Sequence, residues 1–253
     1  MSLPRAFWDV PLAHRALHDI NAGRPENSLA AVRAAMAKGY GIEIDVQLSG
    51  DGAAMVFHDY TLDRVTAETG DVRSHSASHL AGIALHGTDE GIPRLEDVLR
   101  AVDGRVPLVV ELKDQDGRMG TAIGPLEHAV ADALQGYAGP IAVMSFNPNA
   151  VALMADLAPD LPRGIVTSAY DPSVWHLPEE ICDRLRAIPD FERTRASFIS
   201  HEASDLHSPR VAQIKARGAL ICCWTVRSQA EEVAARKIAD NITFEGYLAA
   251  HAS

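Results

Sequence analysis

Short apolar runs and amphipathic helical patterns alternate along almost the whole of this chain of 253 residues. About eight or nine segments are typical of strands, and most consecutive pairs are separated by a segment with helical spacing. Strands that alternate with helices pair in parallel, because each helix carries the chain back to the same starting edge of the sheet. This alternation constrains the fold more than any other feature and predicts an α/β protein with a parallel sheet.

The expected strands lie at 10–13, 41–48, 54–58, 106–113, 141–146, 163–167, 197–201, 220–226 and 241–244. The expected helices lie at 28–38, 95–102, 125–134, 148–157, 209–218 and 229–237, with a partly helical region at 173–193. Residues 60–92 are polar and rich in histidine without a long period, which indicates an excursion from the main fold.

Roughly 250 residues is the typical size of a closed (β/α)8 barrel. We therefore expect one TIM-barrel domain over residues 1–253, with a small insertion after the strand that carries His58. An open doubly wound sheet is the alternative fold. Its nucleotide-binding form is weakened because neither common type of Gly-rich phosphate loop occurs in the sequence.

The net charge of −11 argues against a nucleic-acid partner, which would need a basic surface. Apolar runs stay well short of the roughly 20 residues that cross a bilayer, so we expect no stable membrane association. The N-terminus lacks a basic start followed by a long apolar region, so we expect no signal peptide. Three cysteines, two of them adjacent, form no disulfide framework and fit a reducing cytoplasm. No sequence feature indicates an oligomeric state.

Polar side chains gather where the first predicted strands end, which is where a barrel of this kind carries its active site. One strand ends in His14 and Arg15, the next holds Glu43 and Asp45, and the third ends in His58. Residues i and i+2 of a strand point to the same face, about 6.6 Å apart. The carboxylates at 43 and 45 therefore share the inner face. Residues 111 and 113 are also two apart in a strand, so their side chains share a face as well.

The inner faces of these strands predict a metal site. Glu43, Asp45 and Glu111 would repel one another inside a barrel unless a cation lay between them. Ligands that are all oxygen favour a hard divalent ion, Mg²⁺ or Ca²⁺. Arg15 and Lys113 add positive charge nearby, so the site is expected to bind an anion, of which phosphate fits best.

His14 and His58 supply two groups that titrate near neutral pH, one as general base and one as general acid, in either order. A single histidine or a single Glu-x-Asp pair is more often structural or a solvated face. The coincidence of these residues on one end and one face of successive strands is what indicates an active site.

An ordered set of motifs runs through the chain, densely in the first 115 residues. The segments are Ala13–Arg15, Pro25–Ser28, Gly41–Leu48, Asp51–Gly52, Val56–Asp59, Leu62–Arg64, Ile92–Leu99 and Glu111–Lys113, with weaker matches at Ser145–Phe146, Leu157–Pro159 and Trp224–Val226. Through these motifs the chain resembles the glycerophosphodiester phosphodiesterase family. The ordered set is specific, although each piece alone is not.

The resemblance implies a TIM barrel with a small inserted region and a divalent ion on the three carboxylates named above. It also implies general acid–base catalysis by His14 and His58, phosphate binding by Arg15 and Lys113, and a substrate pocket lined by Trp224. Glu26 and Asn27 are implied to lie near the site.

The reaction that the resemblance implies is hydrolysis of a small glycerophosphodiester to an alcohol and glycerol 3-phosphate. The nucleophile would be water, or a neighbouring substrate hydroxyl that gives a cyclic phosphate first.

Two positions depart from the family pattern. Ala16 stands where the family usually has Gly, a residue that permits backbone angles that Ala resists. Thr243–Tyr247 replaces the usual Thr-Asp-Pro ending, and Glu245 falls near the position of that Asp without an assigned role. Both departures lie where selectivity for the alcohol could be set.

Three other functions are weighed against this one. A lysophospholipid or sphingolipid phosphodiesterase would need an apolar groove from 60–92, Phe146, Trp175 and Trp224, but the polar character of 60–92 favours a small soluble diester. A sugar isomerase or aldolase would need a proton-abstracting base or a Schiff-base Lys, and paired histidines suit diester cleavage better. A non-catalytic phosphate-binding relative would be expected to have lost a catalytic histidine or a metal-binding carboxylate. All five of these residues are present: His14, His58, Glu43, Asp45 and Glu111.

Overall fold

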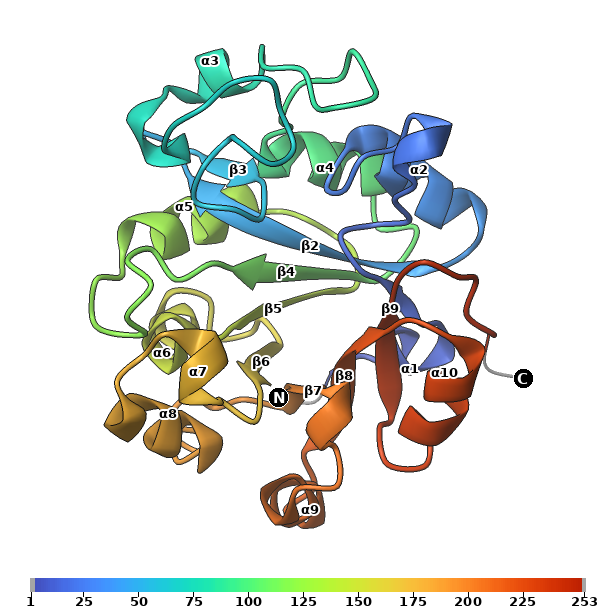
Figure 1. The fold of residues 1–253 in the computed structure, drawn as a ribbon, viewed down its shortest axis with the longest axis vertical. Helices are drawn as coiled ribbons and strands as arrows, with labels where there is room; N and C mark the ends of the chain where they lie inside the picture. Colours follow the sequence, from blue (N-terminus) through green and yellow to red (C-terminus); the bar gives the residue numbers. More distant parts are fainter. Residues whose placement is uncertain (1–2, 252–253) are drawn as a thin grey trace.

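Eight parallel strands close into a ring in the computed structural model, which describes residues 3–251 (Figure 1). β1 pairs in parallel with both β2 and β9, which closes the ring and confirms the expected TIM barrel. In ring order the strands are β1 (Leu12–Ala13), β2 (Gly41–Leu48), β4 (Leu108–Leu112), β5 (Ile141–Ser145), β6 (Arg163–Thr167), β7 (Phe198–Glu202), β8 (Leu220–Val226) and β9 (Asn241–Phe244).

Helices occupy the connections between the strands and surround the ring (Figure 1). The longer ones are α2 (Leu29–Ala37), α4 (Leu95–Val102), α5 (Pro125–Ala133), α6 (Pro148–Leu157), α8 (Glu179–Arg186), α9 (Pro209–Ala216) and α10 (Gln229–Ala235). The short ones are α1 (Ala6–Asp9), α3 (Ala77–Leu80) and α7 (Pro172–Trp175), with single 3-10 turns η1 (Ile20–Ala22), η2 (Val72–Ser74) and η3 (Ala203–Asp205). Within residues 3–251, the helices are all too short or too polar to cross a membrane.

Local signals in the sequence explain where several helices begin. The Ser28 hydroxyl accepts a hydrogen bond from the N–H of Ala31 at the start of α2. The Asn147 side chain caps α6, with Pro148 in the first helical position. Proline is tolerated there because its missing N–H would have no partner within the helix.

β3 (Ala54–Val56) is not a barrel strand. It pairs antiparallel with β2 outside the ring, with Val56 opposite Val46. Counting residues 54–58 with the parallel strands was therefore wrong. The connection at 49–53 is too short for a parallel crossover, which needs a dozen or more residues, so the chain turns back beside β2. His58 thus approaches the carboxyl ends of the barrel strands from the opposite direction.

Residues 60–92 lie beside the barrel, next to β3 and α4 (Figure 1). They pack around a separate apolar cluster, which includes Leu62 and Leu80 of this segment and Phe57, which follows β3. The Asp51 carboxylate accepts a hydrogen bond from the N–H of Ala77, which ties this segment to the β2–β3 turn.

Alternation along the strands separates two apolar layers. Ile42, Ile44 and Val46 of β2 pack between the ring and the helices. Val109 and Phe198 belong instead to the cluster that fills the inside of the ring, together with Phe7 of α1. The residues that alternate with these outward-facing ones point into the barrel. They include residues 43, 45 and 111, which lie toward the carboxyl ends of the strands.

Candidate active site

Glu43, Asp45 and Glu111 converge inside the barrel mouth, as the strand parity predicts. The three residues are 1%, 1% and 6% exposed, and one oxygen of each lies within 4.8 Å of the other two. The register of β2 and β4 places Asp45 directly opposite Glu111. The Arg15 N–H donates to Glu43 Oε2 at 2.9 Å, and Asn27 Nδ2 donates to Asp45 Oδ2 at 3.0 Å. The backbone and one amide thus orient two of the three carboxylates.

The crowding of these carboxylates shows in their protonation. Burial, together with the charges of Asp45 and Glu111, raises the pKa of Glu43 well above its ordinary value. Burial also raises the pKa of Asp45, but Lys113 and the other cations around it outweigh that effect and lower it. Proximity of like charges in a buried site drives such separation of pKa values.

Lys113 crosses the cluster from the end of β4. Its Nζ donates to Glu111 Oε1 at 2.7 Å and to Asp45 Oδ1 at 3.3 Å. Burial lowers the pKa of Lys113, but the two carboxylates outweigh this and hold the pKa above its ordinary value. Among residues 3–251, the lysine and arginine groups that pair with the three carboxylates are this ammonium and the Arg15 guanidinium, so the cluster still suits a further positive ion. Its all-oxygen donor set fits Mg²⁺ or Ca²⁺.

Arg15 lies between the carboxylate cluster and Glu26. Its Nη1 donates to Glu26 Oε1 at 2.8 Å, whereas its buried Nε has no hydrogen-bond partner and lies 3.5 Å from Asp45 Oδ2. Ala16 has a φ of +63°, so an alanine is held in the left-handed region that glycine enters without strain. The Ala16 N–H donates to the Glu43 carbonyl at 2.9 Å, which holds this loop against β2.

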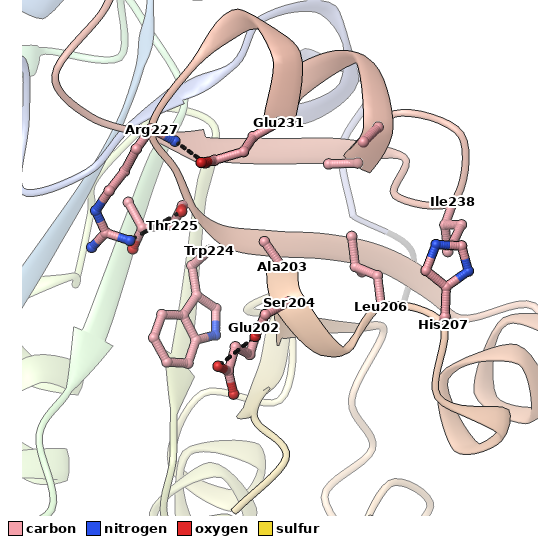
Figure 2. Close-up of a pocket in the computed structure, with 12 residues that line it drawn as sticks. Glu202, Ala203, Ser204, Leu206, His207, Trp224, Thr225, Arg227, Glu231 and Ile238 are labelled. Atoms are coloured by element: carbon pink, nitrogen blue, oxygen red, sulfur yellow. Dashed lines mark hydrogen bonds between the residues drawn. The ribbon is translucent and has the colours of Figure 1, made fainter. Parts of the chain in front are cut away.

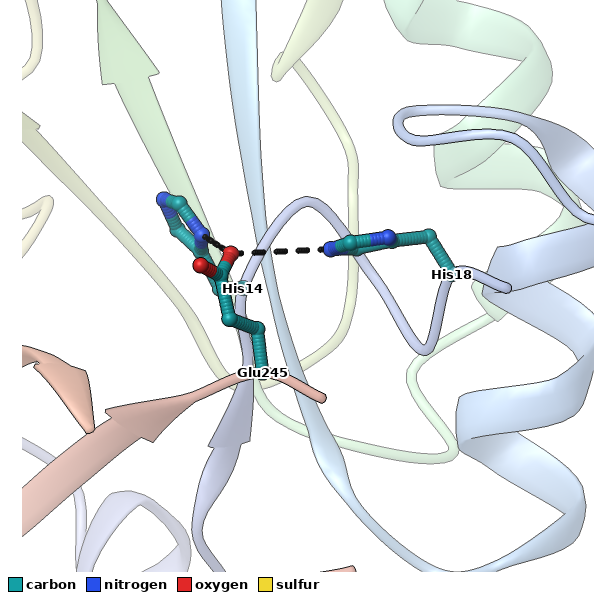
Figure 3. Close-up of side chains that lie close together, drawn as sticks. All are labelled: His14, His18 and Glu245. Atoms are coloured by element: carbon teal, nitrogen blue, oxygen red, sulfur yellow. Dashed lines mark hydrogen bonds and ion pairs between the residues drawn. The ribbon is translucent and has the colours of Figure 1, made fainter. Parts of the chain in front are cut away.

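His14 is oriented by a residue that the sequence analysis left without a role. Glu245 follows β9, and its Oε2 lies 2.6 Å from His14 Nδ1 and 3.6 Å from His18 Nε2 (Figure 3). The other oxygen of Glu245 accepts from Arg227 Nε at 2.8 Å. Burial lowers the pKa of His14, and the hydrogen bond to Glu245 opposes this. Two signals in the sequence point to this role: the inward parity of residues 241, 243 and 245, and the place of Glu245 near the Asp of the family pattern.

His58 has a similar partner in the adjacent residue. Its Nδ1 lies 2.6 Å from Asp59 Oδ1, and Arg64 Nε donates to Asp59 Oδ2 at 2.6 Å. Arg64 also donates to both oxygens of Glu26 at 2.7 and 2.6 Å, which links this histidine to the partner of Arg15. Each of the two predicted histidines therefore has Nδ1 engaged by a carboxylate and Nε2 left for a ligand.

Trp224 lies away from the carboxylates, in the part of the mouth formed by β8. Its Nε1 donates to the Ser200 carbonyl at 3.1 Å, and its ring meets Phe146 edge-on at 5.3 Å between centroids. A cavity of about 390 Å³ lies beside it, lined also by Glu202, Arg227 and residues of η3 and α10 (Figure 2). The structure thus brings the predicted histidines, carboxylates and cations together and connects Trp224 to them through Phe146.

The fold and these side chains define a TIM-barrel phosphodiesterase. Residues 14–242 match the model of the Glycerophosphoryl diester phosphodiesterase family, and the chain belongs to that family.

Proteins of known sequence and structure agree with this membership. The Bacillus subtilis protein YhdW is 28% identical over 229 residues, which make up 86% of each chain. A glycerophosphodiester phosphodiesterase of Caldanaerobacter subterraneus is 32% identical over 164 residues, 60% of this chain and 65% of that protein. A phosphodiesterase of Oleispira antarctica, solved in complex with the product sn-glycerol-3-phosphate, matches with a TM-score of 0.76 and 26% identity, over 95% of this chain and 94% of that one.

Proposed function

We propose that the protein hydrolyses small glycerophosphodiesters to an alcohol and glycerol 3-phosphate. The observation that carries the proposal is the meeting of two carboxylate-bound histidines, His14 and His58, with the buried three-carboxylate cluster at one barrel mouth. The product named for the Oleispira antarctica relative supports the same chemistry.

Glu43, Asp45 and Glu111 would hold a divalent cation, Mg²⁺ or Ca²⁺. When bound, such a cation supplies Lewis-acid polarisation of a phosphoryl oxygen. Lys113 and Arg15 add their charges at the same place, and charged N–H donors of this kind suit the oxygens of a phosphate. A phosphodiester anion is therefore attracted to this point despite the acidic net charge of the chain.

His14 and His58 exchange protons with the reacting groups through Nε2. Hydrogen bonds from Nδ1 to Glu245 and Asp59 hold each ring in one orientation. One histidine removes a proton from the nucleophile, and the other protonates the leaving alkoxide. The nucleophile is water, or a neighbouring hydroxyl of the substrate that would first give a cyclic phosphate.

Product analysis tests this proposal. The chain is incubated in ¹⁸O-labelled water with glycerophosphodiesters and with lysophospholipids, in the presence of Mg²⁺ or Ca²⁺. We expect glycerol 3-phosphate and a free alcohol from the glycerophosphodiesters, with phosphorus NMR revealing any cyclic intermediate. Absence of glycerol 3-phosphate with every diester and either cation would overturn the proposal.

A further inference from the structure

The two departures from the family pattern follow neighbouring strands of the ring. Ala16 lies in the loop after β1, and Glu245 follows β9, which pairs with β1. His18 belongs to the same loop as Ala16, and the catalytic steps proposed above make no use of it. His14, His18 and Glu245 gather two imidazoles and one carboxylate at one place, which we call the His–Glu cluster (Figure 3).

The backbone of the loop after β1 positions His18 beside Glu245. Two consecutive residues, Arg15 and Ala16, have φ of +50° and +63°, so both lie in the left-handed region. The His18 N–H donates to the Ala16 carbonyl at 2.9 Å, which tightens this turn. The N–H of His14 donates at 2.9 Å to the carbonyl of the last residue of β9, which fixes the loop to that strand. The fold thus places the two histidines on either side of one carboxylate (Figure 3).

Three donor atoms of the His–Glu cluster face one another. One donor atom of each residue lies within 4.8 Å of the other two. Glu245 Oε2 is 2.6 Å from His14 Nδ1 and 3.6 Å from His18 Nε2. The side chains of His14, His18 and Glu245 are 14%, 28% and 20% exposed, so the cluster is mostly buried but can be reached by an ion from the solvent.

One of these donor atoms, His18 Nε2, is shielded from water and unpaired. Among residues 3–251 it has no hydrogen-bond partner, and its distance of 3.6 Å from Glu245 Oε2 is too long for a hydrogen bond. Leaving a buried polar atom without a partner is unfavourable. An ion bound between this nitrogen and the carboxylate would supply the missing contact.

The His–Glu cluster offers different ligands from those of the three-carboxylate cluster. Two imidazoles and a carboxylate suit zinc, which is often held by three protein ligands with a fourth position open. Oxygen ligands alone suit Mg²⁺ or Ca²⁺ instead. Zinc bonds to nitrogen and oxygen are about 2.0–2.1 Å long, so two ligand atoms of a tetrahedral zinc ion lie roughly 3.4 Å apart. The oxygen of Glu245 and Nε2 of His18 already have nearly this separation, and the shorter contact with His14 reaches it when that hydrogen bond opens.

We propose that His14, His18 and Glu245 bind one zinc ion and that this ion inhibits the phosphodiesterase. Zinc takes the lone pair of His14 Nδ1, so the single proton of the neutral ring has to lie on Nε2. Nε2 then has no lone pair for a proton from the nucleophile, and a neutral ring gives up no proton to the leaving group near neutral pH. Zinc binding is independent of the proposed function, whereas the inhibition rests on it.

Cobalt(II) tests the site directly, because it replaces zinc in such sites and absorbs visible light far more strongly in tetrahedral than in octahedral coordination. It is added to the protein in excess Mg²⁺, which occupies the three-carboxylate cluster. We expect tetrahedral bands that saturate at one Co²⁺ per chain and disappear when zinc is added. His18→Ala should lower the affinity for both ions by at least about tenfold, the loss that even an outer partner of a metal ligand causes.

His79→Ala is the matched control. His79 stacks on His75 with ring centroids 4.8 Å apart, so this second pair of imidazoles is the alternative place for zinc to bind. The variant should keep the wild-type spectrum and affinity. In assays with saturating Mg²⁺, zinc should lower kcat of the wild type and of His79→Ala at the concentration that fills the site. Half-inhibition of His18→Ala should need at least about tenfold more zinc. Further Mg²⁺ should not relieve the inhibition, because Mg²⁺ prefers oxygen ligands.

The outcomes separate this inference from the proposed function. Absence of the tetrahedral Co²⁺ spectrum, or the same spectrum and affinity in His18→Ala, would overturn the site. Bound zinc that leaves kcat unaltered or raises it would overturn the inhibition. Relief by excess Mg²⁺, with equal inhibition of His18→Ala and the wild type, would overturn it too, since zinc would then act by displacing Mg²⁺. Failure to cleave any glycerophosphodiester without zinc would instead overturn the proposed function, and the Co²⁺ spectrum would still show whether the site exists.

Discussion

Glu245 Oε2 lies 2.6 Å from His14 Nδ1, while Glu245 Oε1 accepts from Arg227 Nε at 2.8 Å. The carboxylate is thereby held by an arginine and in turn orients a histidine at the mouth. Replacing Glu245 with Gln keeps the size of the side chain but removes its charge. We expect kcat to fall by about 10–100-fold with little change in KM, because a partner that orients another group contributes at this level. Steady-state kinetics on a glycerophosphodiester measure both constants.

The control for this substitution is Glu231→Gln, whose carboxylate accepts from the N–H of Arg227 but does not reach His14. Its kcat should match that of the wild type. A Glu245→Gln variant with unaltered kcat would show that His14 needs no carboxylate partner.

The pH dependence of activity follows from the surroundings of His14. Burial lowers its pKa below the ordinary value of 6.5, so the neutral ring persists to lower pH than in a free histidine. If His14 is the general base, the acid limb of kcat/KM should lie below pH 6.5. The hydrogen bond to Glu245 raises this pKa, so Glu245→Gln should move the limb to still lower pH. A limb that moves upward in the variant would contradict this assignment.

The two histidines are expected to be needed together. His14→Ala and His58→Ala should each lower kcat by about 10²–10⁴-fold, the usual contribution of a general acid or base. The double variant should lose much less than the product of the two single losses, because residues that act in one step are not additive. His79→Ala, an exposed histidine of α3, serves as the control and should retain full turnover. Near-normal turnover in either single variant would remove that histidine from the mechanism.

The strands and helices of the barrel could be predicted from the sequence because the patterns that indicate them are local. β2 spans Gly41–Leu48 and α4 spans Leu95–Val102, both with the predicted bounds, since alternation, helical spacing and flanking turns lie within each segment. The direction of β3 was also within reach of the sequence, because the five residues at 49–53 are too few for a parallel crossover. A strand pattern alone does not say which neighbour it pairs with.

In the candidate site, too, local sequence patterns predicted some contacts, whereas others depend on the folded ring. The grouping of Glu43 with Asp45 follows from strand parity, and the structure brings them to Glu111. Glu245 is separated from His14 by 231 residues, so their contact could be found only after the ring had closed.

The interior of the barrel leaves no room for a side chain at position 164. A Cβ atom added to Gly164 of β6 would lie 2.3 Å from Phe198 Cε2, inside the ring. Gly164→Ala should therefore lower the free energy of unfolding by about 1–3 kcal/mol, the usual cost of overpacking a core. Gly120→Ala is the control, because an added Cβ meets nothing within 4 Å there. Urea unfolding of the two variants gives the comparison, and equal midpoints would contradict the expectation.

A divalent cation should stabilise the fold as well as support turnover. Three buried carboxylates repel one another, so Mg²⁺ or Ca²⁺ bound between them should raise the melting temperature. At a free cation concentration a hundred times Kd, the free energy of unfolding should rise by about 2.7 kcal/mol. Chelation should abolish activity, and either cation should restore it. Because the pKa of Glu43 is raised, protons compete with the cation, and Kd should rise as the pH falls.

Glu111→Gln should weaken the thermal shift, whereas Asp171→Asn, at an exposed carboxylate, should not. Full activity in the chelated protein, with no thermal shift on adding either cation, would show that the cluster binds neither.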